Sequence, residues 1–155
     1  KALDFLNQQP EWKEFKFVIK EHPSWPRSFN QLHDKNPNII FANNNNTQEL
    51  IENALAVATI NSTVGIEALL LDKNVLTLGN AFFNIEGLVH HCSSQKVLNE
   101  TLLTIEHQKV NNELVARFLS YLKAEYLIPQ SWSKISNPDE HFSAVIERLE
   151  NPYTV

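Results

Sequence analysis

The chain has 155 residues, which is enough for one domain with a sizeable buried core. A formal net charge of −5 without a basic stripe argues against a nucleic-acid-binding protein, and no apolar run is long enough to cross a membrane. The single cysteine, Cys92, cannot form an internal disulfide, which favours a reducing compartment. Because the sequence contains no methionine and begins within a helical pattern at Lys1, we expect a fragment of a longer protein.

The first half of the chain alternates strand and helix patterns. The tail of a helix is expected before Gln9-Pro10, which breaks it. Strands are predicted at 15–20, 39–41, 56–60 and 75–78, with helical segments at 30–35, 47–54 and 66–71 between them. This alternation predicts an α/β fold with a Rossmann-like parallel sheet, flanked by helices and joined by right-handed crossovers.

The second half of the chain is mainly helical. An aromatic loop at 80–88 is followed by a brief strand at 89–92 and by helices at 93–105, 110–126 and 139–149. Ser93 or Ser94 can cap the first of these helices. We interpret three aromatic residues, Phe82, Phe83 and Trp132, as packing groups rather than base-stacking groups. The whole chain, 1–155, is expected to be a single domain that ends in C-terminal helices at 108–155.

The central stretch, residues 56–79, reads as strand, turn, helix and strand. Asn61, Ser62 and Thr63 occupy the turn after its first strand, where open α/β sheets hold their ligands. Their polar groups, together with the N–H groups of a helix start, suit a phosphate. The alternative is that one of the three residues only caps the helix, and the sequence does not decide between these interpretations.

A His-Pro pair, His22-Pro23, follows the first predicted strand. A histidine at this place can donate a hydrogen bond to a phosphate oxygen and can become cationic as a dianionic ligand approaches. Pro23 ends the strand and fixes the loop. The alternative is a surface histidine before a strand-ending proline. Because the ends of three strands, at 20–23, 42–49 and 61–63, are expected to converge at one edge, the pattern favours a ligand site.

Two glutamates near helix starts are further candidates. Glu49 can accept hydrogen bonds from ribose hydroxyls, as acidic residues do in other nucleotide-binding folds. The alternative for Glu49 is favourable placement in the field of the helix, which is worth about 0.3–1 kcal/mol. Glu67 is either a second ribose contact or a buried partner of Lys20, and we favour the structural role.

The run His90-His91-Cys92 contains residue types that bind metals, but its spacing argues against a metal site. Adjacent residues on a strand face opposite ways, and no second Cys/His cluster completes the ligand set. We therefore predict neither a metal nor a cofactor. No neighbouring arrangement marks Cys92 as an activated nucleophile.

Four ordered motifs resemble those of the capsule polysaccharide biosynthesis family of bacterial Kdo transferases, which act on capsule and O-antigen glycans (Kdo is 3-deoxy-D-manno-oct-2-ulosonic acid). The motifs are KEHP at 20–23, TINSTVGIEALLLDKNVLTLG at 59–79, NAFFNIEGLV at 80–89 and YLIP at 126–129. The His-Pro pair also resembles that of bacterial sialyltransferases. In both groups the fold is a two-domain GT-B glycosyltransferase, whose C-terminal domain binds the CMP half of a CMP-activated sugar.

The resemblance implies roles toward CMP for several residues. His22 would bind the phosphate and stabilise it as the sugar leaves. Ser62 and Thr63 stand where the sialyltransferase-like pattern has a phosphate-binding pair of hydroxyls. The residues implied to bind CMP are Lys20, His22, Pro23, Glu49, Asn61, Ser62 and Thr63.

Two of these roles concern the nucleoside, and two positions depart from the family pattern. Glu49 stands where a ribose-binding carboxylate is expected, and Lys20 would approach the cytosine or the phosphate. Asp72-Lys73-Asn74 replaces a usual Gly-Lys-Pro turn, and Gln130 stands where glycine is common. The second departure makes the C-terminal loop harder to assign by resemblance.

The resemblance also implies a missing half. In a GT-B enzyme the acceptor site and the catalytic carboxylates lie largely in the N-terminal domain, so we expect no catalytic residue here beyond His22. The complete enzyme would transfer Kdo from CMP-β-Kdo to a bacterial surface polysaccharide or a lipid-linked acceptor with retention of configuration, using an N-terminal carboxylate as nucleophile. It would be cytoplasmic, with peripheral association at the inner membrane left open.

Three alternatives remain at this stage. In the first, the enzyme is a sialyltransferase whose donor is CMP-sialic acid. In the second, the domain is a non-catalytic scaffold in a capsule assembly complex. In the third, the chain is half of an epimerase that binds a UDP-sugar.

Overall fold

The computed structural model describes residues 16–22, 24, 29, 31, 37–128, 130–131 and 133–151. Several sequence-based predictions fall outside these residues: the helix tail before Pro10, most of the turn at 30–35, and the positions of Pro23 and Trp132. The chain divides into two compact units, Lys1–Asn111 and Asn112–Val155.

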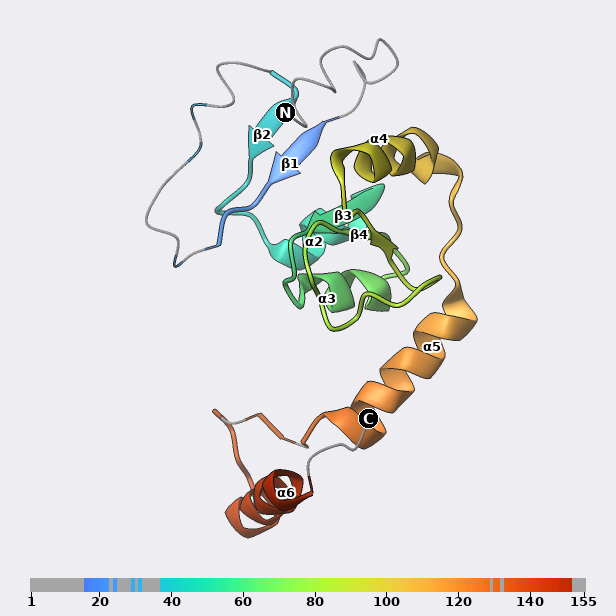
Figure 1. Cartoon of the computed structure of the whole chain (residues 1–155). Coiled ribbons are helices and arrows are strands. Elements are labelled where there is room, and N and C mark those ends of the chain that lie inside the picture. The colour runs from blue at the N-terminus through green and yellow to red at the C-terminus, as the bar shows by residue number, and fades with distance from the viewer. Residues whose placement is uncertain are drawn as a thin grey trace. The chain divides into compact units, whose positions relative to one another are not determined.

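The elements of the first unit follow one another in the predicted order (Figure 1). They are β1 (Phe17–Ile19), β2 (Ile39–Phe41), α2 (Thr47–Glu52), β3 (Ala56–Thr59), α3 (Val64–Leu70), β4 (Asn74–Thr77), β5 (His90–His91), α4 (Gln95–Thr104) and the 3-10 helix η3 (Ile105–His107). Ser94 caps α4 by accepting a hydrogen bond from the backbone N–H of Val97, so the second of the two predicted caps is the correct one.

All strand pairs of this unit are parallel, as the alternation of strands and helices predicts. β1 pairs with β2, while β3, β4 and β5 form a second sheet in that order. The fold is therefore α/β with parallel sheets flanked by helices, a Rossmann-like arrangement. Instead of the expected single sheet, the described strands form two sheets, one of two strands and one of three. β1 is only three residues long. The residues that follow it bind the loop after β2.

Side chains of β4 alternate between two helical layers. Figure 1 shows α4 on one face of the β3–β4 pair and α3 on the other. Leu76 belongs to a buried cluster with Cys92 and Ile105, against which Leu98 and Leu102 of α4 pack. Neighbouring residues on a strand point to opposite faces, so Val75 faces α3 instead.

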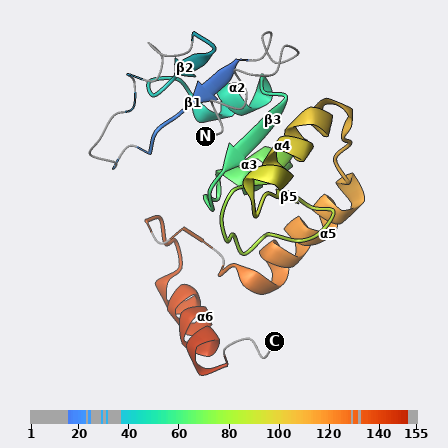
Figure 2. The same ribbon diagram turned by 45° about the horizontal axis from the view of Figure 1, so that its top comes forward.

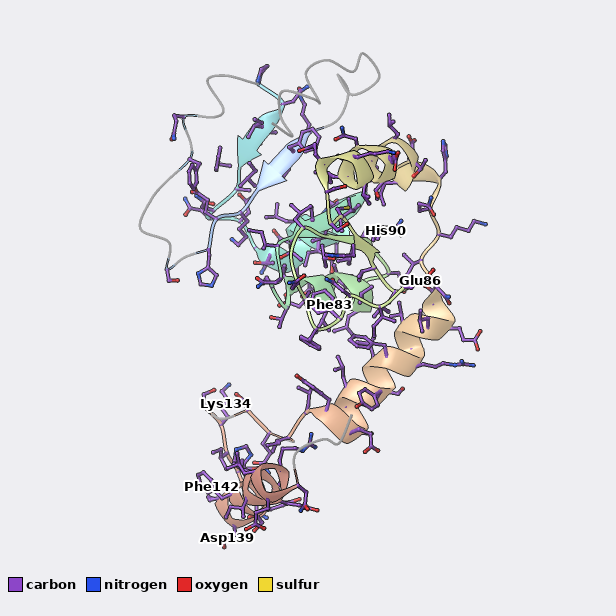
Figure 3. The ribbon with its side chains drawn as sticks, viewed as in Figure 1. Phe83, Glu86, His90, Lys134, Asp139 and Phe142 are labelled. Atoms are coloured by element: carbon purple, nitrogen blue, oxygen red, sulfur yellow. The ribbon has the colours of Figure 1, made fainter. Side chains whose placement is uncertain are left out.

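The α3 face is closed by Phe83, which is fully buried and lies beside α3 in Figure 3. A Cβ added to Gly65 of α3 would meet the Phe83 ring at 2.9 Å and Val75 Cγ1 at 3.3 Å. Gly65 is therefore required for close approach of helix and loop. The burial of Phe83 confirms that it is a packing residue, whereas its neighbour Phe82 is 53% exposed.

Both departures from the expected glycine fall at left-handed backbone positions. Asp72 has a φ of 54° and Gln130 a φ of 74°. Aspartate tolerates this conformation better than most residues. The side-chain carbonyl of Gln130 accepts hydrogen bonds from the backbone N–H groups of Ser136 and Asn137 and from the Ser136 hydroxyl, which hold this residue in place.

The second unit consists of α5 (Asn112–Tyr121), a π-helical segment η4 (Leu122–Tyr126) and α6 (Pro138–Glu150). The predicted helix at 110–126 thus changes its hydrogen-bonding pattern after Tyr121. Arg148 of α6 donates to the carbonyl oxygens of Glu125 and Tyr126, at 2.7 and 3.3 Å, which ties α6 to the end of η4. Both contacts belong to this unit alone.

Candidate functional site

The carboxyl ends of β1 and β2 are joined by side chains. Lys20 Nζ donates to the carbonyl oxygens of Asn43 and Asn45, at 2.9 and 2.7 Å. The side chains of Glu21 and Asn43 bind each other, because Asn43 Nδ2 donates to Glu21 Oε2 at 2.7 Å while the Glu21 N–H donates to Asn43 Oδ1 at 2.9 Å. Two of the three predicted strand ends therefore converge.

Lys20 has only part of its hydrogen-bonding capacity left for a ligand. Its ammonium group carries three N–H donors, and two of them are used by the asparagine run. In this structure Lys20 is mainly a residue that positions the loop between β2 and α2. Glu67 is exposed in the first turn of α3, so the interpretation of Glu67 as a buried partner of Lys20 is wrong.

His22 is exposed at this edge and one of its ring nitrogens is already engaged. The backbone N–H of Ser24 donates to His22 Nδ1 at 3.3 Å, and the Ser24 hydroxyl lies 2.7 Å from the same atom. A backbone N–H can only donate, so Nδ1 is an acceptor and the neutral ring carries its hydrogen on Nε2. The local turn thus prepares His22 to donate a hydrogen bond through Nε2.

The start of α2 places Glu49 in the first turn of the helix, with an exposed side chain. Asn46 caps this helix by accepting hydrogen bonds from the backbone N–H groups of Gln48 and Glu49. Thr47 is therefore the first residue of the helix, where the predicted helical segment at 47–54 begins.

The turn between β3 and α3 uses its three polar residues differently. Ser62 Oγ accepts a hydrogen bond from the Val64 N–H at 3.3 Å, while Thr63, at the N-cap position, makes no capping bond through its side chain. Asn61, Ser62 and Thr63 are all exposed. The capping alternative therefore applies to Ser62, and the Thr63 hydroxyl is not used for it.

Four residues that the sequence does not single out as ligand-binding residues complete this edge: Thr59, Thr77, Asn84 and His91. Thr59, at the end of β3, accepts a hydrogen bond from the Ser62 N–H through its hydroxyl at 3.1 Å. Farther along the sheet, His91 Nδ1 lies 3.2 Å from Thr77 Oγ1 and 3.0 Å from Asn84 Nδ2. Polar residues at the ends of buried strands were the available signal, since Thr77 ends β4 and His91 ends β5.

The polar residues of the second sheet form one continuous edge. The N–H groups of Leu78 and Gly79 donate to the carbonyl oxygens of Thr59 and Ile60, which links the ends of β3 and β4. Asn84 Nδ2 then donates to the Gly79 carbonyl at 3.0 Å. Figure 2 shows the loop that follows β4, in yellow-green, returning to β5. The third predicted strand end therefore lies with Thr77, Asn84 and His91, in a different sheet from Lys20 and His22.

Of the two neighbours of His91 in the sequence, Cys92 is buried and His90 is half-buried. Burial lowers the pKa of His90. Burial raises the pKa of the Cys92 thiol, and its hydrogen bond to Thr101 acts in the opposite direction. Cys92 is thus a packed residue of the core. Among the described residues, no three His, Cys, Asp or Glu side chains are grouped as a metal site would require.

Comparison with known proteins identifies the family. The chain matches the family model described as "Capsule polysaccharide biosynthesis protein" over residues 4–130, which is most of its length. The chain belongs to the capsule polysaccharide biosynthesis protein family. The matched segment includes both strand edges described above and ends beyond η4.

Two curated relatives of this capsule family member are longer proteins. The chain is 43% identical to Protein FixF of Sinorhizobium fredii (strain NBRC 101917 / NGR234) over 129 residues, covering 83% of this chain and 32% of FixF. It is 33% identical to the Capsule polysaccharide export protein KpsS of Escherichia coli over 87 residues, covering 50% of this chain and 22% of KpsS. The chain therefore spans a third or less of the length of these relatives.

No solved structure matches this capsule family chain at a significant level. Within the part of the chain that the structure describes, no helix combines the length and the apolar character needed to span a bilayer.

Proposed function

We propose that this chain is the donor-binding part of a glycosyltransferase that transfers Kdo from CMP-β-Kdo to a bacterial surface polysaccharide or a lipid-linked acceptor. The observation that carries the proposal is the geometry of His22. Its Nδ1 accepts from Ser24, and its exposed ring therefore offers Nε2–H at the carboxyl end of a parallel strand. Family membership supplies the class of pathway, the biosynthesis of capsule polysaccharide.

The remaining proposed contacts concern the phosphate and the ribose of CMP. Ser62 and Thr63 are exposed at the end of β3, and the Thr63 hydroxyl is not used to cap α3. Both are proposed to donate to the phosphate, with Asn61 beside them. Glu49 is proposed to accept hydrogen bonds from the ribose hydroxyls.

Pro23, which lies outside the described residues, and Lys20 complete the proposed set of CMP-binding residues. Lys20 acts mainly through the loop that it holds, and its third N–H is available to the nucleotide.

The chemical contribution of such a site is stabilisation of the leaving group. As the sugar departs, negative charge builds on the phosphate of CMP, and donors aimed at that phosphate lower the barrier because they are held in place before the reaction begins. Ser24 provides this preorganisation for His22. The proposal places the acceptor site and the nucleophilic carboxylate in the other domain of a GT-B enzyme.

The experiment is a calorimetric titration of the chain with CMP and with UDP. We expect selective binding of CMP. His22→Asn, whose amide reproduces the position of Nδ1 but not of Nε2, should weaken CMP binding by about 1.5–3 kcal/mol, which is about ten- to a hundred-fold in Kd. His22→Gln, whose amide reaches the position of Nε2, should retain much of the affinity.

The matched control is His107→Asn, because His107 is an exposed histidine at the end of η3, away from both strand edges. This variant should bind CMP as the wild type does. Preference for UDP would favour the epimerase alternative, and failure to bind either nucleotide would favour a scaffold. Undiminished CMP binding by His22→Asn would show that His22 does not contribute to CMP binding.

A further inference from the structure

His91, the last residue of β5, has an exposed ring whose Nδ1 is held from two sides. The Thr77 hydroxyl lies 3.2 Å from Nδ1 and the Asn84 amide nitrogen 3.0 Å from it. Thr77 is fully buried, so it provides a fixed point beneath the ring. The side chain of His91 is thus oriented by the end of β4 and by the loop that joins β4 to β5.

The partners of Nδ1 determine which ring nitrogen carries the hydrogen. Asn84 Nδ2 also donates to the Gly79 carbonyl at 3.0 Å, which excludes the opposite orientation of the amide, since an amide oxygen cannot donate to a carbonyl. Nδ2 can therefore only donate to His91, and Nδ1 must accept. In the neutral ring the hydrogen lies on Nε2, on the side of the ring away from Asn84 and Thr77.

The orientation of Asn84 leaves one of its own atoms unsatisfied. Asn84 Oδ1 is buried and has no hydrogen-bond partner among the described residues. A buried acceptor without a partner is uncommon and costs about 1–3 kcal/mol. Turning the Asn84 amide would lose both hydrogen bonds of its N–H groups, to the Gly79 carbonyl and to His91 Nδ1. The arrangement therefore favours a role in which the two N–H groups of Asn84 fix the loop and the histidine.

His91 also lies on the edge that carries two of the proposed phosphate contacts, Ser62 and Thr63. Backbone hydrogen bonds join the ends of β3 and β4, and Thr59 Oγ1 accepts from the Ser62 N–H. From Ser62 to His91, the carboxyl ends of β3, β4 and β5 therefore form a single connected rim. Ligands of open α/β sheets bind outside such a rim.

We infer that His91 is a further donor-binding residue, which gives an Nε2–H hydrogen bond to an anionic oxygen of the CMP-activated sugar. Asn84 and Thr77 are its positioning residues. The anionic oxygen belongs either to the phosphate or to the carboxylate of the sugar, since both present the same hydrogen-bond acceptor. This inference deepens the proposed function and rests on it for the identity of the ligand.

The test compares His91→Asn and His91→Gln with the wild type in titrations with CMP, CMP-Kdo and UDP. Asn reproduces the position of Nδ1 and loses the donor at Nε2, so its affinity should fall about ten- to a hundred-fold. Gln places an amide near Nε2 and should restore most of that loss. Equal weakening of CMP and CMP-Kdo assigns the phosphate, and weakening of CMP-Kdo alone assigns the sugar carboxylate.

The same titrations separate failure of the inference from failure of the proposed function. If the wild type binds CMP and CMP-Kdo selectively and His91→Asn binds both equally well, the inference is overturned while the function stands. If the wild type prefers UDP and His91→Asn weakens UDP, the CMP assignment fails but the role of His91 in binding an anionic group remains. Binding of none of the three ligands by the wild type overturns both.

A spectroscopic measurement tests the geometry without a ligand. Nitrogen-15 NMR of the imidazole should show His91 with hydrogen on Nε2 in the wild type. Asn84→Ala removes the group that can only donate to Nδ1, so the ring should become a mixture of tautomers in this variant. Hydrogen on Nδ1 of the wild-type ring would overturn the inference. His107, which lies elsewhere, serves as the internal reference in the same spectrum.

Discussion

The two strand edges of the first unit are built in different ways. At the ends of β1 and β2, exposed side chains bind one another and the backbone of the asparagine run. The ends of β3, β4 and β5 also carry polar side chains, but this edge includes buried residues: Thr59 and Thr77 are buried, and Phe83 is fully buried. The first edge shapes a loop, and the second presents side chains from a packed core.

This difference separates two ways of positioning a ligand-binding histidine. His22 depends on a short turn, in which Ser24 lies two residues away. His91 depends on Thr77 and Asn84, which are 14 and seven residues away in the sequence. Changes under the second edge should therefore affect the stability of the whole unit, and changes at the first edge should act locally.

The strongest test of this comparison concerns Phe83 beneath the second edge. Phe83→Ala should lower the free energy of unfolding by about 3–5 kcal/mol, because it leaves a cavity in a fully buried site. Phe82→Ala is the matched control, since Phe82 is 53% exposed and meets Phe83 edge to face. The control should lose about 1 kcal/mol. Urea unfolding measures both values, and equal losses would contradict the assignment of Phe83 to the core.

A smaller effect is expected from filling the space between α3 and the loop. Gly65→Ala brings a Cβ to 2.9 Å from the Phe83 ring, closer than atoms tolerate, so the ring or the helix must shift. The expected loss is about 1–3 kcal/mol in the free energy of unfolding. The double variant Gly65→Ala with Phe83→Leu should recover part of this loss, and simple addition of the two single losses would argue against the contact.

At the first edge, Lys20→Met should have a local effect. The substitution keeps much of the aliphatic chain but removes the two bonds to Asn43 and Asn45, so amide exchange should accelerate in the loop between β2 and α2. Because Lys20 is exposed, the global loss should be about 1 kcal/mol or less. Lys16→Met is the control, since among the described residues Lys16 donates only to the Asn38 side chain. A large loss in the free energy of unfolding for Lys20→Met would contradict the proposed difference between the two edges.

The weakest effect should be a change in pH dependence. Burial lowers the pKa of His90 in the folded protein, so the unfolded chain binds the proton more readily. The contribution of neutral His90 to the free energy of unfolding is fully present above the pKa of the unfolded chain, about 6.5. It is lost as the pH falls from there through the lower pKa of the folded protein. His90→Gln should therefore reduce the loss of stability below about pH 6.5. Thermal unfolding across this range measures the effect, and an unchanged slope would contradict it.

Much of the fold follows from local patterns in the sequence. The predicted strand at 39–41 coincides with β2, and Ser94, one of the two predicted caps, begins α4. These features depend on residues within a few positions of one another, so turn and cap preferences are sufficient. The division into two sheets was not predictable in this way, because the pairing of β1 with β2 alone is decided by contacts between residues more than 20 positions apart.

The candidate site was predicted in part. The sequence located polar residues at three strand ends, and the structure joins the ends of β1 and β2 directly. The link between His91 and Asn84 could not be found from spacing, because it depends on the path of the loop after β4. The run His90-His91-Cys92 has the residue types of a metal site, but the feature that distinguishes His91 is its position at the end of β5.

Asp72 and Gln130, which have left-handed backbone conformations, also affect the conformational entropy of the unfolded chain. A glycine at either place would make the native backbone easier to adopt, but it would let the unfolded chain sample many more conformations. The side chains present here restrict that ensemble, while the hydrogen bonds accepted by Gln130 hold its native geometry. With only three glycines in 155 residues, this protein limits the entropy of its denatured state more than a glycine-rich nucleotide-binding domain does.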